Sequence, residues 1–168
     1  MTRPDKTKPD KTRPDKRQMK SAARLYAVQA LFQMEAAGQT VDAITREFET
    51  HRFGEVFEDD QMADGDVTHF RALVEHAVNW QARLDQMTDR ALVAKWPIGR
   101  IDPVLRAVFR AAGAELTEMP TPPKVVISEF VTVAKAFFPE GKEASFVNAV
   151  LDHMAREARP EAFSAEPG

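Results

Sequence analysis

The chain contains no cysteine and lacks the patterns that mark secreted, membrane and common catalytic proteins. Without cysteine, a disulfide framework, a thiol nucleophile and a cysteine-based metal site are all excluded, which fits a reducing cytoplasm. Charged residues interrupt every apolar run before it reaches the length of a membrane span, and no apolar block follows the charged N-terminus as in a secretory signal. We therefore expect a cytoplasmic protein that does not contact a membrane.

Catalytic and metal-binding motifs are also missing. The sequence contains no glycine-rich phosphate loop, no HExxH motif and no nucleophile elbow. His69 and His76 are seven residues apart and share a helix face, but two ligands separated by two turns do not hold a metal ion unaided, and no third ligand is evident. We predict that the protein is not an enzyme and carries no metal or cofactor.

Charge is distributed unevenly along the chain, whose net charge is −3. Residues 1–24 contain nine basic and three acidic side chains, a net of +6, which leaves −9 for the remainder. An acidic body with a basic N-terminal end predicts a polyanionic partner at that end. A tail kept soluble by its charge is the other interpretation of the same pattern.

The composition divides the chain into three parts. A five-residue unit containing Pro-Asp-Lys is repeated three times near the N-terminus, and such a segment buries too little apolar area to offset its ordering entropy. We therefore predict a disordered basic arm over residues 1–17, a helical domain over residues 18–158 and a frayed tail over residues 159–168.

Apolar residues recur at helical spacing through the central part, which predicts an all-α bundle of about six or seven helices. The expected helices begin near Met19, at Thr40, at Asp66, at Asp102, before Val126 and at Lys142. The first helix is expected to end at Gly38. The helix that begins at Asp66 follows an acidic loop and is expected to run unbroken into the late eighties. Residues 122–141 are rich in β-branched side chains, which favour a strand, but their helical spacing over more than three turns favours a helix.

Basic residues follow one side of the first helix at intervals of three to four residues: Lys16, Arg17, Lys20 and Arg24. Positive charge at a helix N-terminus opposes the helix dipole, and a bound phosphate backbone would neutralise it. About four phosphate contacts on single-stranded nucleic acid would give a log–log salt slope of roughly −3. The nearby Tyr26 could stack on a base, whereas the position of Phe32 favours the core.

Three segments carry a family resemblance: "AARLYAVQALFQ" (Ala22–Gln33), "WPIGRIDPVLRAVFRAAGAEL" (Trp96–Leu116) and "PPKVVISEFVTVAKAFFPEGKEASFVNAVLD" (Pro122–Asp152). In this order they resemble the NusB family of bacterial transcription antitermination factors, over roughly residues 20–156. The resemblance implies an all-helical fold of two helical halves without enzymatic activity. It also implies that the protein binds the boxA element of nascent ribosomal RNA leaders with NusE, the transcription-borne form of a small-subunit ribosomal protein. It further implies that this complex acts on RNA polymerase. Whether the free protein is a monomer or a homodimer does not follow from the sequence.

In this family, RNA contacts come from the arginine-rich start of the first helix and from the helix that begins near "FVN". The resemblance therefore implies RNA contacts at Lys20, Arg24, Phe146 and Asn148, and the cationic stripe adds Arg17. Phe146 also falls in line with core positions of its helix, so a core role is the alternative to base stacking.

Several family positions have lost charge in this chain. Ser21 and Ala22 stand where the family has arginines, Leu25 replaces an acid, and Ser145 and Ala149 replace the basic residue and the glycine around "FVN". Either RNA affinity is weak without NusE, or charge is supplied from elsewhere in the chain.

We hypothesise that the basic arm supplies this charge, since it lies directly upstream of the thinned arginine cluster. Deleting residues 2–16 is expected to weaken boxA RNA binding and to flatten its salt dependence, because fewer counterions are then released. Filter binding over a series of salt concentrations measures the slope, and an unchanged slope would contradict the hypothesis.

A second interpretation assigns the chain to another functional class. The acidic body could act as a protein–protein scaffold that binds NusE or another basic partner without itself contacting RNA. A gel shift with boxA RNA, with and without NusE, separates the two interpretations.

Overall fold

The computed structural model describes residues 15–52, 63–92 and 100–164, and these contain helices but no strand. In chain order the elements are α1 (Lys16–Ala37), α2 (Val41–Glu47), the π-helix η1 (Phe48–Arg52), α4 (Ala63–Asn79), α5 (Gln81–Ala91), α6 (Pro103–Glu118), α7 (Pro123–Phe137), α8 (Lys142–Ala158) and α9 (Glu161–Ser164). The predicted all-α fold is therefore confirmed, and the ambiguous residues 122–141 contain a helix.

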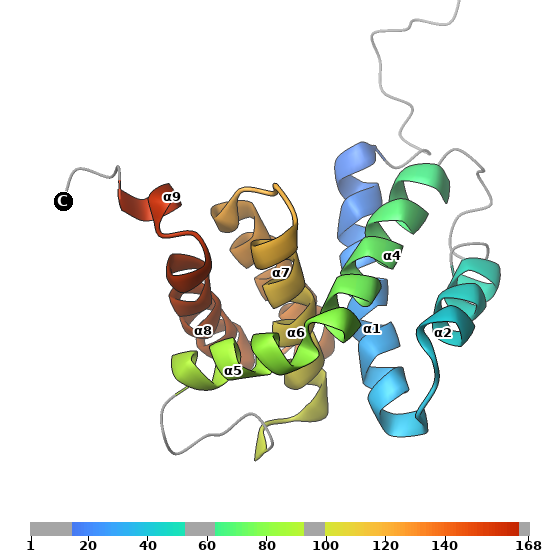
Figure 1. Cartoon of the computed structure of the whole chain (residues 1–168), viewed down its shortest axis with the longest axis horizontal. Coiled ribbons are helices and arrows are strands. Elements are labelled where there is room, and N and C mark those ends of the chain that lie inside the picture. The colour runs from blue at the N-terminus through green and yellow to red at the C-terminus, as the bar shows by residue number, and fades with distance from the viewer. Residues whose placement is uncertain (1–14, 53–62, 93–99, 165–168) are drawn as a thin grey trace, which may run out of the picture.

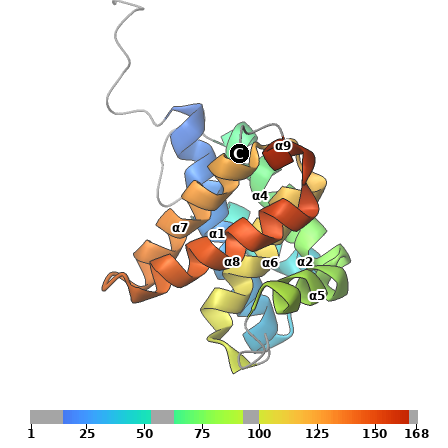
Figure 2. The same cartoon turned by 90° about the vertical axis from the view of Figure 1, so that its left-hand side faces the viewer.

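Helix α6 forms the centre of the bundle (Figure 1). It packs against α1 and α4 on one side and against α5, α7 and α8 on the other, which gives the two helical halves. Phe109 of α6 is completely buried, as are Phe70 of α4 and Phe130 of α7. One continuous apolar core therefore joins the halves and fixes α1, α7 and α8 relative to one another (Figure 2).

Helix α1 begins earlier than the sequence predicts, because the third Pro-Asp-Lys unit contains its cap. The side chain of Asp15 accepts a hydrogen bond from the Gln18 amide at 2.8 Å, and the Gln18 side chain accepts one from the Asp15 amide at 2.9 Å. This capping box satisfies two amide groups that the helix leaves unpaired. In the first two units a lysine or arginine stands where Gln18 stands in the third. The predicted boundary of the arm at residue 17 thus falls inside α1.

Most other helix ends lie where the sequence places them. Gly38 ends α1 in the left-handed conformation, with φ of 70°. Thr40 caps α2 through its side chain, and Asp102 caps α6 by accepting a hydrogen bond from the Val104 amide at 2.7 Å. Pro103 occupies the first turn of α6, where no amide hydrogen is required.

The predicted helix from Asp66 to the late eighties is wrong in two respects. Helix α4 begins three residues before Asp66, so this residue lies inside the helix and does not cap it. The run then divides at Trp80, whose φ of −112° and ψ of 18° are not helical. The Trp80 amide still donates to the carbonyl of His76, and its carbonyl accepts from Leu84, so the hydrogen bonds continue across a kink. The acidic loop expected before Asp66 lies largely outside the described residues.

The segment after α8 is held by two arginines. Arg159 donates hydrogen bonds to the carbonyls of Leu116 at 2.7 Å and Thr121 at 2.6 Å. It thus satisfies one carbonyl in the last turn of α6 and one in the segment that follows the helix. Within residues 159–168, expected to be frayed, α9 forms one turn, and the Arg156 guanidinium lies 4.5 Å from the ring centroid of Phe163. None of the described helices has the length and apolarity to cross a membrane.

Candidate nucleic-acid interface

Arg17 and Lys20 project from the first turns of α1 and are exposed. Neither forms an ion pair with another residue in the part of the chain that the structure describes. The adjacent Ser21 fixes this end of the helix, because its hydroxyl lies 2.8 Å from a carboxylate oxygen of Glu129 on α7. Two unpaired cations are therefore held on an anchored helix end, where they can meet a phosphate backbone.

Arg24 does not belong to this exposed surface. Only 3% of the residue is accessible, and its Nε and Nη2 atoms donate to the two carboxylate oxygens of Glu115 at 2.9 and 2.8 Å. Its Nη1 atom also lies 3.6 Å from Glu129. This buried position does not fit the RNA contact predicted at Arg24. Helix α1 enters the bundle at this turn, and α6 and α7 cover its cationic face.

Glu115 is the centre of a buried ionic cluster with Arg24, Glu129 and His69. It is fully buried on α6, and His69 Nε2 of α4 lies 3.5 Å from its Oε1 atom. Burial by itself raises the pKa of Glu115, but Arg24 and then His69 outweigh it and lower the pKa to about 2. The carboxylate is thus ionised, and the cluster joins α1, α4, α6 and α7. The second histidine of the pair, His76, takes no part, and the described residues contain no group of three metal ligands.

The burial of the two aromatic residues of α1 is the reverse of what the sequence predicts. Tyr26 is buried and packs edge-on against Phe48, with ring centroids 6.5 Å apart, so it is not available to stack on a base. Phe32, expected in the core, is 39% exposed. Helical spacing alone did not distinguish the covered from the uncovered side of this helix.

Phe146 lines a pocket where α8 begins beside the start of α6. Its half-buried ring makes a T-shaped contact with Phe109, at a centroid distance of 6.0 Å. The core role predicted as the alternative therefore applies to part of the ring. The pocket has a volume of about 530 Å³, and its other lining residues are Arg100, Ile101, Asp102, Leu105, Lys142 and Glu143. A mainly apolar surface flanked by two exposed cations can accept a base and its phosphate. The sequence analysis did not select Arg100 or Lys142 as binding residues, although both lie within the segments that carry the family resemblance.

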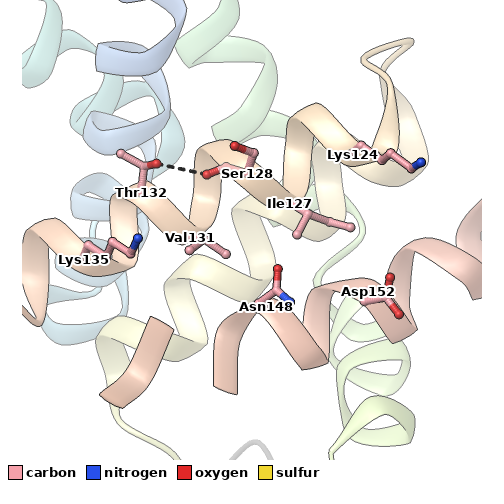
Figure 3. Close-up of a pocket in the computed structure, with 8 residues that line it drawn as sticks. All are labelled: Lys124, Ile127, Ser128, Val131, Thr132, Lys135, Asn148 and Asp152. Carbon is pink, nitrogen blue, oxygen red and sulfur yellow. Dashed lines mark hydrogen bonds between the residues drawn. The ribbon is translucent and has the colours of Figure 1, made fainter. Parts of the chain in front are cut away.

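Asn148 lies on a different face of α8 from Phe146, because residues two positions apart in a helix are separated by about 200° around its axis. Its exposed side chain faces a groove between α7 and α8 that also contains Lys124 and Lys135 (Figure 3). The predicted RNA-binding residues therefore occupy separate places: the start of α1, the Phe146 pocket and the α7–α8 groove. Helix α7 packs against both α1 and α8 and so connects these places. Residues 1–14 of the basic arm predicted over residues 1–17 lie outside the described residues.

Comparison with known proteins agrees with these features. The model of the NusB family matches residues 21–156. Transcription antitermination protein NusB of Rhodopseudomonas palustris strain BisB18 is 47% identical over 146 residues, covering 86% of each chain. The protein of the same name from Caulobacter vibrioides is 46% identical over 145 residues, covering 84% of this chain and 95% of its own.

Solved structures show the same fold. NusB of T. maritima superposes with a TM-score of 0.68 at 29% identity, covering 86% of this chain and 96% of its own. A crystal structure of the antitermination factors NusB and NusE in complex with double-stranded RNA gives a TM-score of 0.65 at 21% identity, covering 83% and 97%. The family match spans all described helices except the first five residues of α1, the last two residues of α8 and the short α9. The chain belongs to the NusB family.

Proposed function

We propose that this protein is an RNA-binding transcription antitermination factor that binds the boxA element of nascent ribosomal RNA leaders together with NusE. The observation that carries the proposal is the family match over residues 21–156, with relatives named as antitermination proteins at 46–47% identity. The proteins in one solved structure of the same fold are NusB and NusE in complex with RNA, which supports the same pair of partners here. The protein performs no catalysis in this role.

Arg17 and Lys20 would provide the first electrostatic contacts to RNA. Both are exposed and unpaired among the described residues, and both project from a helix end that Ser21 and Glu129 hold in place. A preorganised pair of cations loses less conformational freedom on binding than cations in a flexible segment. Phosphate contacts of this kind give affinity and position without reading the sequence.

The pocket beside Phe146 would then accept an unstacked base. Sequence-specific RNA recognition targets single-stranded regions whose bases stack on aromatic side chains. One edge of the Phe146 ring is fixed against Phe109, so the ring presents a rigid surface, and Arg100 and Lys142 lie within reach of the attached backbone.

Replacing both Arg17 and Lys20 by glutamine is expected to weaken boxA RNA binding roughly 10- to 30-fold near 0.1 M salt. The loss of two phosphate contacts should also reduce the steepness of the log–log salt slope by about 1.4, at about 0.7 per contact on a single strand. Fluorescence anisotropy with labelled boxA RNA, in the presence of NusE and at four or more salt concentrations, measures both quantities.

The matched control is the double variant Arg46→Gln/Arg83→Gln, which removes the same charge from exposed positions on α2 and α5. It should shift affinity little and keep the wild-type slope. Equal losses in the two double variants would mean that only net charge matters, and the α1 interface would be wrong. A NusE complex that holds RNA no better than NusE alone would favour the protein–protein scaffold instead.

A further inference from the structure

The Phe146 pocket combines an apolar lining with charges of both signs. Its described lining residues are apolar, basic and acidic in turn: Phe146, Ile101 and Leu105, then Arg100 and Lys142, then Asp102 and Glu143. The two positive and two negative charges cancel. A site built for phosphate alone gains nothing from two carboxylates, because they repel the phosphate. The lining instead fits an uncharged aromatic ring with a polar edge, which is the chemistry of a nucleobase.

Asp102 has an acceptor that its structural role does not use. The residue caps α6, and its Oδ1 atom accepts a hydrogen bond from the Val104 amide at 2.7 Å. Among the described residues, no hydrogen bond or ion pair engages the Oδ2 atom. Both oxygens of a carboxylate accept hydrogen bonds, and the residue is exposed, so Oδ2 is available to a ligand in the pocket. The cap also holds the side chain in place before a ligand arrives.

The second acid of the pocket has an explanation within its own helix. Glu143 lies in the first turn of α8, whose N-cap residue Gly141 provides no side-chain hydrogen bond to the helix amides. A carboxylate in the first turn interacts favourably with the helix dipole and with these amides. Asp102 is therefore the acid whose unused oxygen calls for a ligand.

A carboxylate oxygen distinguishes bases by the hydrogen-bond donors on their edges. It accepts a hydrogen bond from an exocyclic amino group, such as N4 of cytosine. Uracil presents a carbonyl oxygen at the same position, and its N3–H donor lies between two carbonyl oxygens that repel a carboxylate. Cytosine and uracil are otherwise alike in size and shape, so this edge decides which of the two pyrimidines binds more tightly.

We propose that Asp102 is a specificity-determining residue of the Phe146 pocket. Its Oδ2 atom accepts a hydrogen bond from the exocyclic amino group of a base that stacks on Phe146, and the pocket thereby selects cytosine over uracil. The inference rests on the proposed RNA-binding function and adds base selection to a site of stacking and phosphate contact. Arg100 and Lys142 offset the repulsion between the Asp102 carboxylate and the RNA backbone.

Asp102→Asn separates base selection from folding, because asparagine caps a helix as well as aspartate does. The amide can present either its oxygen or its NH2 group, so it accommodates both pyrimidines. Wild type with NusE should bind oligocytidylate about tenfold more tightly than oligouridylate of equal length, since the hydrogen bond involves a charged acceptor. The variant should bind the two RNAs with nearly equal affinity. Fluorescence anisotropy with both labelled oligonucleotides at 0.1 M salt measures the ratio.

Two further variants control for charge and for stacking. Asp42→Asn makes the same chemical change at an exposed position in the first turn of α2 and should keep the wild-type ratio. Phe146→Leu removes the aromatic surface and should weaken binding of both RNAs by about tenfold, the usual worth of a stacked base. A preference for oligocytidylate that is lost in Asp102→Asn and kept in Asp42→Asn supports the assignment.

The same ratio in wild type and Asp102→Asn would overturn the inference, and so would a wild type that prefers oligouridylate. Either result leaves the proposed function intact if Arg17→Gln/Lys20→Gln still weakens the binding of boxA RNA. A variant at position 102 that loses NusE but keeps the wild-type ratio would assign Asp102 to protein binding and would also overturn the inference. No RNA binding by wild type with NusE would overturn the function itself.

Discussion

Replacing Arg24 by methionine is expected to lower the free energy of unfolding by about 3–5 kcal/mol, although the family resemblance predicts an RNA contact at this residue. The substitution keeps much of the side-chain volume but leaves the Glu115 carboxylate buried without its bidentate partner. Removing one member of a buried ion pair costs this much because the remaining charge has lost both water and its counter-charge. Urea unfolding at pH 7, followed by far-ultraviolet circular dichroism, measures the loss.

Two variants control this experiment. Arg17→Met removes the same functional group from an exposed position of the same helix and should change stability by no more than about 0.5 kcal/mol. Arg24→Met/Glu115→Leu removes both charges and should recover a large part of the loss, because an apolar pair can replace a buried ion pair. If Arg24→Met were as stable as wild type and bound RNA as poorly as Arg17→Gln/Lys20→Gln, the buried role of Arg24 would be refuted.

Local sequence chemistry predicted the helix ends well. The left-handed glycine at position 38, the side-chain caps at Thr40 and Asp102 and the proline at position 103 each act within a few residues of themselves. Their effects do not depend on distant parts of the chain, so they could be identified from sequence alone. The kink at Trp80 has no such local cause, since neither proline nor glycine is present there.

The burial of Arg24 could not be predicted in the same way. Lys20 and Arg24 are one helical turn apart and equivalent in any helical pattern, yet one is exposed and the other is buried. The difference arises from Glu115, which is 91 residues away in the chain. Only the packing of α6 against α1 distinguishes a surface cation from a core cation.

The α7–α8 groove shows a pattern that sequence analysis could have found. Lys124, Ser128, Thr132 and Lys135 are spaced by four, four and three residues, which places polar groups along one face of α7. That Asn148 faces the same groove depends on how α8 packs against α7, and no local pattern contains this information.

Acidification is expected to destabilise the protein through Glu115. Its pKa is about 2 in the folded protein, against an ordinary value of 4.5, so the unfolded chain binds the proton more readily. The stabilisation by this carboxylate is therefore fully present above about pH 4.5 and is lost as the pH falls towards 2. The integrated loss is about 2 kcal/mol by pH 3 and about 3 kcal/mol by pH 2. Urea unfolding at intervals between pH 7 and pH 3 measures it.

The variant Arg24→Met/Glu115→Leu separates the effect of the Arg24–Glu115 pair from that of the exposed carboxylates. Exposed pairs such as Arg156 with Asp152 also weaken on acidification, but they do so equally in both proteins. The difference in unfolding free energy between wild type and double variant should therefore stay constant from pH 7 to about pH 5. Below that pH the wild type should lose stability relative to the double variant. Parallel curves down to pH 3 would show that the folded and unfolded chains bind the Glu115 proton equally, and the buried cluster would not hold this carboxylate ionised.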